Sequence, residues 1–213
     1  MTLLDVPASA PPPAATPPRR AGRWIAAVAV VVMLAVGGLL VVATWSYDDI
    51  PAPDVLQPHH AIVELREVPV PVQHAFVAAV DPDFYDSDTS VVPSLIIRRY
   101  AVIAANDGDN DASSWRAFVM ASKLEAQYTR EQLLGFYLNV ADYGRGAEGL
   151  VEASQTYFGK PPTRLTVAEA ALLAVQLDPD QPETQAGWDE VLDTMVDNGW
   201  PTAAERNGLT FPR

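Results

Sequence analysis

The sequence contains no cysteine and is poor in basic residues. Without cysteine, a disulfide framework and any cysteine-based metal site are excluded. Beyond residue 23 the chain carries 26 acidic and 11 basic residues, a formal charge of −15. A nucleic acid partner is therefore not expected, because its phosphates require a basic surface. No alternating apolar–polar run is long enough to predict a sheet.

The sequence also lacks a convincing metal-binding pattern, and we expect no metal and no cofactor. His59, His60 and His74 do not combine with nearby acids at a metal-ligand spacing. The stretch "DGDND" at 107–111 resembles the start of a calcium loop, but the twelfth position of that loop is Phe118 instead of an acid.

One long apolar run is present, at residues 24–45, and it predicts a transmembrane helix. A helix of 22 residues spans ~33 Å, enough for a hydrocarbon core of ~30 Å. The start of segment 1–23 is rich in proline and alanine, which predicts a disordered tail. The segment has three arginines and one acid, so the positive-inside rule places this tail in the cytoplasm and the C-terminal part outside. A cleaved signal peptide is the alternative, which the length of the run disfavours. Prolines across 46–71 predict an extended stalk, with a short strand at 61–68.

Residues 72–213 show helical periodicity, and we predict an all-α domain. Helices are expected at 73–80, 93–105, 115–128, from 130, from 167 and from 203. Ser114 is a candidate N-cap, and three capping boxes pair Thr129 with Gln132, Thr166 with Glu169, and Thr202 with Glu205. Between them, "YGRGAEG" at 143–149 predicts a glycine-rich turn.

Five stretches carry a resemblance to a known family: Leu124-Glu125, "YTREQLLGFYLN" (128–139), "YGRGAEG" (143–149), "YFGK" (157–160) and "LTVAEAALLA" (165–174). Together they resemble the peptidoglycan glycosyltransferase domain of bifunctional penicillin-binding proteins and monofunctional transglycosylases. The resemblance implies a lysozyme-like helical fold outside the membrane. It also implies that the domain joins disaccharides from a lipid-linked precursor into glycan strands.

Family members use two glutamates, and this sequence carries neither. The first belongs to an "E-D-x-x-F-Y" motif that aligns with "VDPDFY" at 80–85, so that Val80 stands at the position of the general base. The second belongs to an "R-K-x-x-E" motif whose slots fall on Ser113, Ser114 and Ala117. A positioned base is worth ~10²–10⁴-fold in rate. The resemblance therefore predicts a degenerate member with little or no polymerase activity.

The aspartate-rich stretch "VDPDFYDSD" at 80–88 has two interpretations. It is either a solvated acidic turn or the place of a relocated base, with Asp81 or Asp83 reaching in and Asp81 as the candidate catalytic residue. In the relocated case an aspartate must reach from a different backbone position, and a misplacement of ~1 Å costs ~10²-fold.

The candidate substrate-binding residues are Arg98, Arg99, Asn139, Arg145 and Lys160. Arg98 and Arg99 stand where the family has two glutamines, and guanidinium groups suit a pyrophosphate; equally, they could line the solvent face of their helix. Asn139, Arg145 and Lys160 match family motifs, with ordinary turn cations as the alternative for the last two.

The expected partners are the lipid-linked precursor, the membrane and a cell-wall synthase. Two further hypotheses stay open at this stage. The chain is a working transglycosylase that uses displaced acids, or it is a structural interaction module that touches no precursor.

Overall fold

The computed structural model describes residues 19–85, 92–178 and 184–212, and the chain divides into two units, 1–49 and 50–213. The first unit contains α1 (Arg19–Asp49), which includes the apolar run at 24–45. Among the described residues, none of the helices combines the length and the apolar character needed to cross a membrane. The structure therefore does not confirm the predicted span. The tail predicted for 1–23 lies outside the described residues as far as residue 18.

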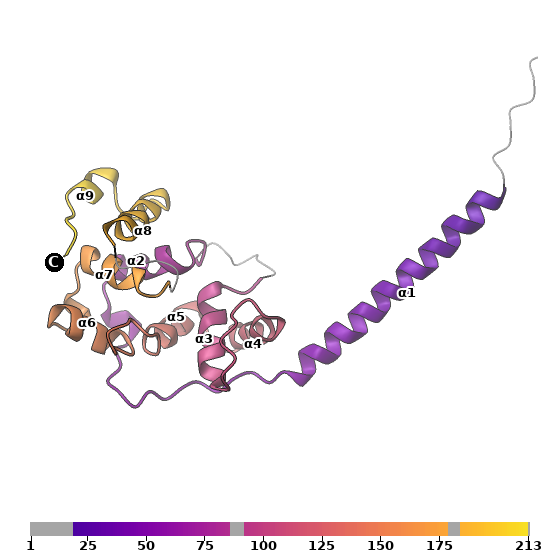
Figure 1. The fold of residues 1–213 in the computed structure, drawn as a ribbon, viewed down its shortest axis with the longest axis horizontal. Helices are drawn as coiled ribbons and strands as arrows, with labels where there is room; N and C mark the ends of the chain where they lie inside the picture. Colours follow the sequence, from indigo (N-terminus) through magenta and orange to yellow (C-terminus); the bar gives the residue numbers. More distant parts are fainter. Residues whose placement is uncertain (1–18, 86–91, 179–183, 213) are drawn as a thin grey trace, which may run out of the picture. The chain divides into compact units, whose positions relative to one another are not determined.

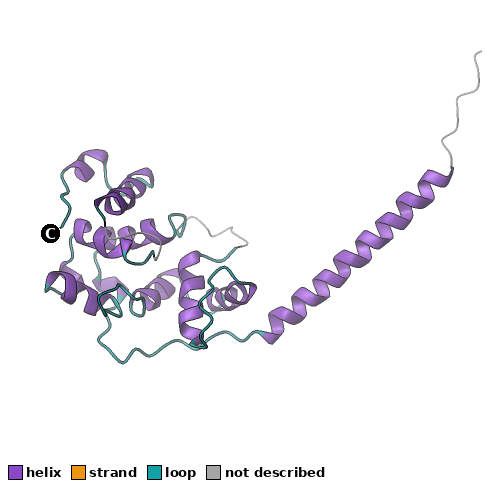
Figure 2. Ribbon diagram, in the orientation of Figure 1, coloured by secondary structure: helices purple, strands orange, loops and turns teal. Residues whose placement is uncertain are grey.

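The second unit is built from helices (Figures 1 and 2). In chain order they are η1 (Leu65–Glu67), α2 (Val70–Val80), α3 (Leu95–Ala105), α4 (Trp115–Glu125), α5 (Arg130–Leu138), α6 (Leu150–Phe158), η3 (Pro162–Arg164), α7 (Val167–Val175), α8 (Gln185–Asp197) and α9 (Ala203–Asn207). The described ranges contain no β-strand, only an isolated bridge between Asp142 and Glu148. The predicted all-α class is confirmed for these ranges.

The core is centred on α2, an almost wholly apolar helix that packs against α7 and α8. A helix that is apolar on all sides is stable only when it is buried. Phe76 of α2 is fully buried and meets the ring of Tyr143 edge-on. The indole N–H of Trp188, on α8, donates to the Ala168 carbonyl and fixes α8 on α7. A second layer is formed by α3 with α4 and α5.

The helix ends form where the sequence predicts them. All three capping boxes are present, with reciprocal hydrogen bonds between the N-cap threonine and the residue three positions later. Ser114 caps α4 by accepting from the Ala117 amide. Each such cap contributes ~1 kcal/mol because it satisfies an N–H group that has no partner within the helix.

The segment predicted as an extended stalk packs against the helices instead. From Ile50 onward it lies against the helical unit: the Lys123 ammonium donates to the Ile50 carbonyl at 2.5 Å, and the Leu56 amide donates to the Tyr100 hydroxyl at 3.3 Å. The strand predicted at 61–68 is wrong, because Leu65–Glu67 form a 3₁₀ turn. Without a neighbouring strand, this extended segment obtains its hydrogen bonds from side chains instead.

Candidate functional site

A cleft with a volume of about 690 Å³ lies beside α3 and the C-terminal end of α5. Half of its lining residues are apolar, and its polar groups come from one arginine, one tyrosine, Asp142 and the loop at 106–114. The lining residues are Leu95, Arg99, Val102, Ile103, Asn110, Asp111, Ala112, Ser113, Tyr137, Ala141, Asp142 and Leu177. A volume of this size is typical of small-molecule sites.

Arg99 supplies the positive charge of this cleft. Its Nη1 donates to the Leu177 carbonyl at 2.7 Å, and the guanidinium also donates to the Tyr137 hydroxyl. Burial raises the pKa of Tyr137 while Arg99 opposes the rise, so this phenol stays neutral near pH 7. A guanidinium has five N–H donors, and these two contacts leave others for an anionic ligand.

Arg98 lies apart from Arg99, although the two are adjacent in the sequence. Its Nη1 donates to the Ala112 carbonyl at 3.1 Å and holds the loop before α4 against α3. Its Nε is buried and has no hydrogen-bond partner. Arg98 does not line the cleft, so the structure places only one of the two predicted phosphate ligands there.

Two acids lie at the cleft, Asp111 and Asp142. Hydrogen bonds from the Ser113 hydroxyl at 2.6 Å and the Ser113 amide at 2.8 Å lower the pKa of Asp111. A carboxylate stabilised in its charged form is a weak base. The Asp142 carboxylate accepts from the Gly144 amide at 2.8 Å. Neither acid occupies a position that the sequence pattern predicts as catalytic.

The two positions that correspond to the missing glutamates belong to the core. Val80 is 7% exposed and Ala117 is fully buried, and both lie in the same apolar cluster. The described chain therefore offers no proton acceptor at either position.

Asp81 follows Val80 and ends α2, and its carboxylate is held at the start of α3. Its Oδ2 accepts from the Ser94 hydroxyl at 2.5 Å and from the Leu95 amide at 2.8 Å. Ser94 is 5% exposed and also donates its backbone N–H to Glu125. Leu95 lines the cleft, so the Asp81 carboxylate is hydrogen-bonded to a residue of the cleft wall.

Glu125 forms a polar cluster with Asp81, Ser94 and Arg130, and it was not predicted as a site residue. Burial raises its pKa and the Asp81 charge adds to the rise, whereas Arg130 at 3.2 Å and the Ser94 N–H lower it. Arg130 in turn donates to the Phe84 carbonyl at 2.6 Å. The cluster thus joins the ends of α2 and α4 to the starts of α3 and α5. The sequence signal was the matched pair Leu124-Glu125, which was read as a family marker only.

The raised pKa of Glu125 gives a testable pH dependence. The folded protein holds this proton more tightly than the unfolded chain, whose value is near 4.5. The contribution of Glu125 to stability is therefore most favourable at low pH and declines as the pH rises from 4.5 through the raised value. We expect Glu125→Gln to remove that decline, measured as thermal midpoints between pH 4 and 7. Exposed Glu131→Gln is the control, and parallel curves for both variants would contradict the expectation.

The remaining predicted residues lie elsewhere. Asn139 is 8% exposed, and its amide makes three hydrogen bonds to backbone: one from the Val63 N–H, one to the Val63 carbonyl and one to the Gly135 carbonyl. The Arg145 guanidinium lies over the Tyr157 ring, 4.2 Å from its centre. Lys160 pairs with Glu169 at 2.6 Å. None of the three lines the cleft.

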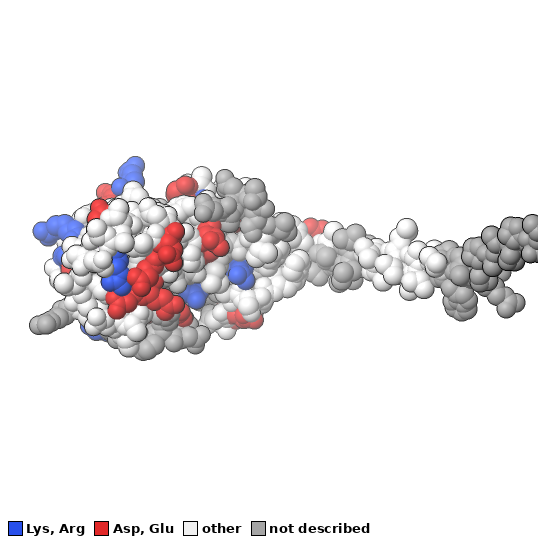
Figure 3. All heavy atoms as spheres, turned by 90° about the horizontal axis from the view of Figure 1, so that it is seen from above, with Lys and Arg blue, Asp and Glu red and all other residues white. Residues whose placement is uncertain are grey.

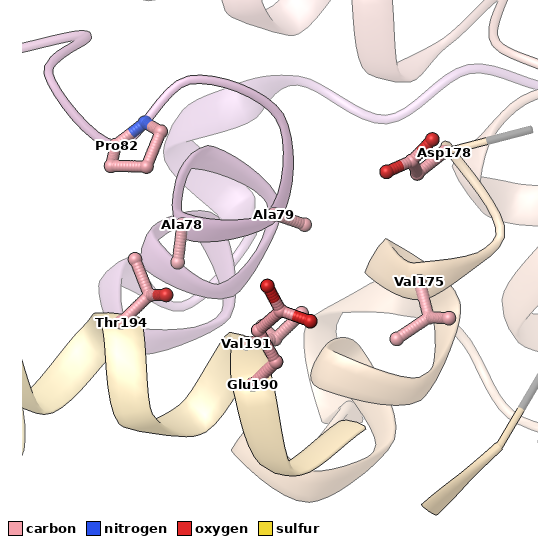
Figure 4. Close-up of a pocket in the computed structure, with 8 residues that line it drawn as sticks. All are labelled: Ala78, Ala79, Pro82, Val175, Asp178, Glu190, Val191 and Thr194. Atoms are coloured by element: carbon pink, nitrogen blue, oxygen red, sulfur yellow. The ribbon is translucent and has the colours of Figure 1, made fainter. Parts of the chain in front are cut away.

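A smaller pocket of about 270 Å³ lies between α2, α7 and α8 (Figure 4). Asp178 and Glu190 turn their carboxylates toward its middle. Two negative charges disfavour a pyrophosphate ligand there, so this pocket is a poorer candidate than the cleft with Arg99. Among the described residues, no three histidine or acidic side chains are grouped to hold a metal ion.

Comparison with known proteins gives consistent matches. Residues 103–195 match the family model described as "Transglycosylase". The chain is 33% identical over 182 residues to penicillin-binding protein 1A of Mycolicibacterium smegmatis, covering 70% of this chain and 23% of the relative. It is 32% identical over 186 residues to penicillin-binding protein 1A of Mycobacterium tuberculosis, covering 70% and 22%. A biosynthetic peptidoglycan transglycosylase of Klebsiella oxytoca is 50% identical over 54 residues, 25% of this chain and 22% of that protein. The chain thus spans less than a quarter of the length of these relatives.

Proposed function

The chain belongs to the transglycosylase family, and we propose that it acts in peptidoglycan synthesis by binding the lipid-linked precursor without polymerising it. The observation that carries the proposal is the burial of Val80 and Ala117 in the core, beside a retained cleft with Arg99. A scaffold can outlast its catalytic groups, because packing and chemistry are separate requirements.

The sequence alone supports the proposed location. The apolar run at 24–45 with Trp24 and Trp45 at its ends suits a membrane anchor, and Arg19, Arg20 and Arg23 suit a cytoplasmic N-terminus. With this anchor, the helical unit lies outside the cytoplasm. It has a lysozyme-like fold and meets the precursor at the external face of the membrane that the anchor spans. A cell-wall synthase is the protein partner that this location favours.

The first experiment measures glycan-strand formation and precursor binding by the full-length protein in detergent. We expect no polymer under conditions in which a family member with both glutamates produces it. We expect Arg99→Ala to weaken binding of the lipid-linked disaccharide at least tenfold, because hydrogen bonds to a charged group contribute ~1.5–3 kcal/mol. Circular dichroism checks that the variant is folded, since Arg99 also contacts Leu177 and Tyr137.

The matched control is Arg164→Ala, which removes an exposed arginine from η3. Equal affinity of both variants would contradict the assignment of the cleft. Absence of precursor binding in the unmodified protein, together with co-purification of a cell-wall protein, would favour a structural interaction module instead.

A working enzyme with displaced acids is the second candidate, and the cluster of Asp81 and Glu125 favours it. A carboxyl group with a raised pKa beside a second carboxylate is a common arrangement in acid–base catalysis. Polymer formation that is lost in Asp81→Asn or Glu125→Gln, but kept in Asp83→Asn, would establish this candidate. Activity that depends on none of them would reject it.

A further inference from the structure

A third pocket, distinct from the cleft, lies between the start of α2, the start of α7 and the α8–α9 turn. Its lining is apolar with one ionised group: Pro71, His74, Val167, Met195, Trp200, Pro201, Glu205 and Leu209. Its volume of about 200 Å³ is below the ~300–1,000 Å³ typical of small-molecule sites. The pocket therefore suits a single side chain better than a disaccharide.

Two aromatic rings form one side of this pocket. The indole of Trp200 stacks on the imidazole of His74, with centroids 4.4 Å apart and planes at 21°. Tyr85 meets both rings edge-on. Burial lowers the pKa of His74, so the imidazole is neutral near pH 7 and adds no positive charge. The aromatic face is therefore able to attract a cation.

Glu205 provides a fixed negative charge at the rim. Its Oε2 accepts from the Thr202 amide at 2.7 Å and from the Thr202 hydroxyl at 2.9 Å. These bonds lower the pKa of Glu205, which keeps the carboxylate ionised. Because Oε2 accepts both of them, Oε1 is left for a ligand.

The C-terminal segment that carries Glu205 is acidic as well. Residues 184–212 carry five acids and one arginine, and Arg206 already pairs with Asp189 and Asp193. Seen from above, the helical unit shows a band of acidic side chains with basic side chains beside it (Figure 3). Exposed Val70 continues the apolar surface beside Pro71.

We propose that this pocket is a docking site for a basic side chain, such as lysine, on a segment of a partner protein. The aliphatic stem of a lysine fits the apolar lining, while its ammonium group reaches Glu205 and the face of Trp200. The acidic C-terminal segment attracts a basic segment toward the pocket and opposes acidic partners. This site does not depend on the proposed function of the cleft.

The test uses the ¹⁵N-labelled full-length protein and a capped glycine–serine peptide that carries three lysines. We expect the peptide to shift the indole N–H signal of Trp200, assigned with a Trp200→Phe variant. The same peptide with acetylated lysines keeps the stems but loses the charge, and we expect it to bind at least fivefold more weakly. Glu205→Gln keeps the oxygen that caps α9 and should weaken binding of the lysine peptide about fivefold.

The matched control is Glu148→Gln, which removes an exposed acid outside the pocket and should leave affinity unchanged. Equal weakening by both substitutions would show attraction to net charge only and would overturn the proposal. Equal binding of the acetylated peptide, or shifts that spare Trp200, would overturn it as well. Because no precursor is present, failure here is distinct from failure of the cleft assignment.

Discussion

Ala117→Glu, which restores a carboxyl group at the second family position, is expected to destabilise the protein by about 4 kcal/mol or more at pH 7. Ala117 is fully buried on the face of α4 that packs into the core. A glutamate buried in such a place has a pKa of ~8–9, so it stays protonated at pH 7. Holding a group of ordinary pKa ~4.3 protonated at pH 7 costs ~3.7 kcal/mol, and its added volume costs more.

The measurement is unfolding by urea, with the full-length protein at pH 7 and at pH 5. At pH 5 the protonation cost falls to ~1 kcal/mol, so much of the loss should disappear if burial of the acid is its cause. Ala126→Glu places the same side chain at an exposed position one residue after α4 and should change stability by less than ~0.5 kcal/mol. A loss below ~1 kcal/mol at position 117 would show that the site still opens to solvent.

That outcome also bears on the proposed lack of polymerase activity. If position 117 tolerates a glutamate, the site is still open there, and substitution could restore the acid that it lacks. If it does not, the core has closed over the position, and a glutamate at 117 cannot serve as the second catalytic acid. The burial of Val80 in the same cluster favours the second interpretation.

The parts of the fold that sequence predicted are those governed by local chemistry. A capping box needs two residues three positions apart, and all three formed. The turn at 143–149 formed for the same reason, with positive φ at Gly144, Gly146 and Gly149. The family resemblance likewise rests on long ordered motifs, and residues 103–195 match the family model.

The predictions that differed depend on contacts between distant residues. Asn139 stays a predicted substrate ligand, but sequence reasoning did not foresee that its amide binds the backbone of Val63, 76 residues away in the sequence. Proline composition predicted a stalk, but composition carries no information about Tyr100 or Lys123, which hold that segment. Arg98 and Arg99 point in different directions because adjacent residues on a helix lie ~100° apart, which sequence reasoning about a pair overlooked.

The cluster of Asp81, Ser94, Glu125 and Arg130 explains how the first half of the unit keeps its shape after losing its motif. Four helix ends meet there, and each contributes a hydrogen-bonding or charged group. Helix ends carry unpaired N–H and C=O groups, so a polar cluster at their junction satisfies groups that the core cannot. The helix junction beside the cleft is thus held together by these four residues, without a glutamate at position 80 or 117.

Gly149→Ala is expected to be the most damaging of the single-methyl changes in the turn that precedes α6. Gly149 has φ +80°, and an added Cβ would lie 2.6 Å from the Asn139 carbonyl oxygen and 2.6 Å from His60 Nε2. With ψ 156° this backbone conformation is essentially restricted to glycine and costs another residue ~1–3 kcal/mol, and a clash with backbone cannot be relieved by a side-chain rotation. We expect a loss of at least ~3 kcal/mol in unfolding by urea.

Gly146→Ala is the matched control, because Gly146 has a similar φ of +74° but nothing within 4 Å of an added Cβ. It should lose only the conformational part, ~1–2 kcal/mol. The double variant His60→Ala/Gly149→Ala should stay as unstable as Gly149→Ala, since the contact with the Asn139 backbone remains. Recovery in the double variant would show instead that the His60 ring is the obstacle and that the Asn139 backbone can shift to relieve its own contact.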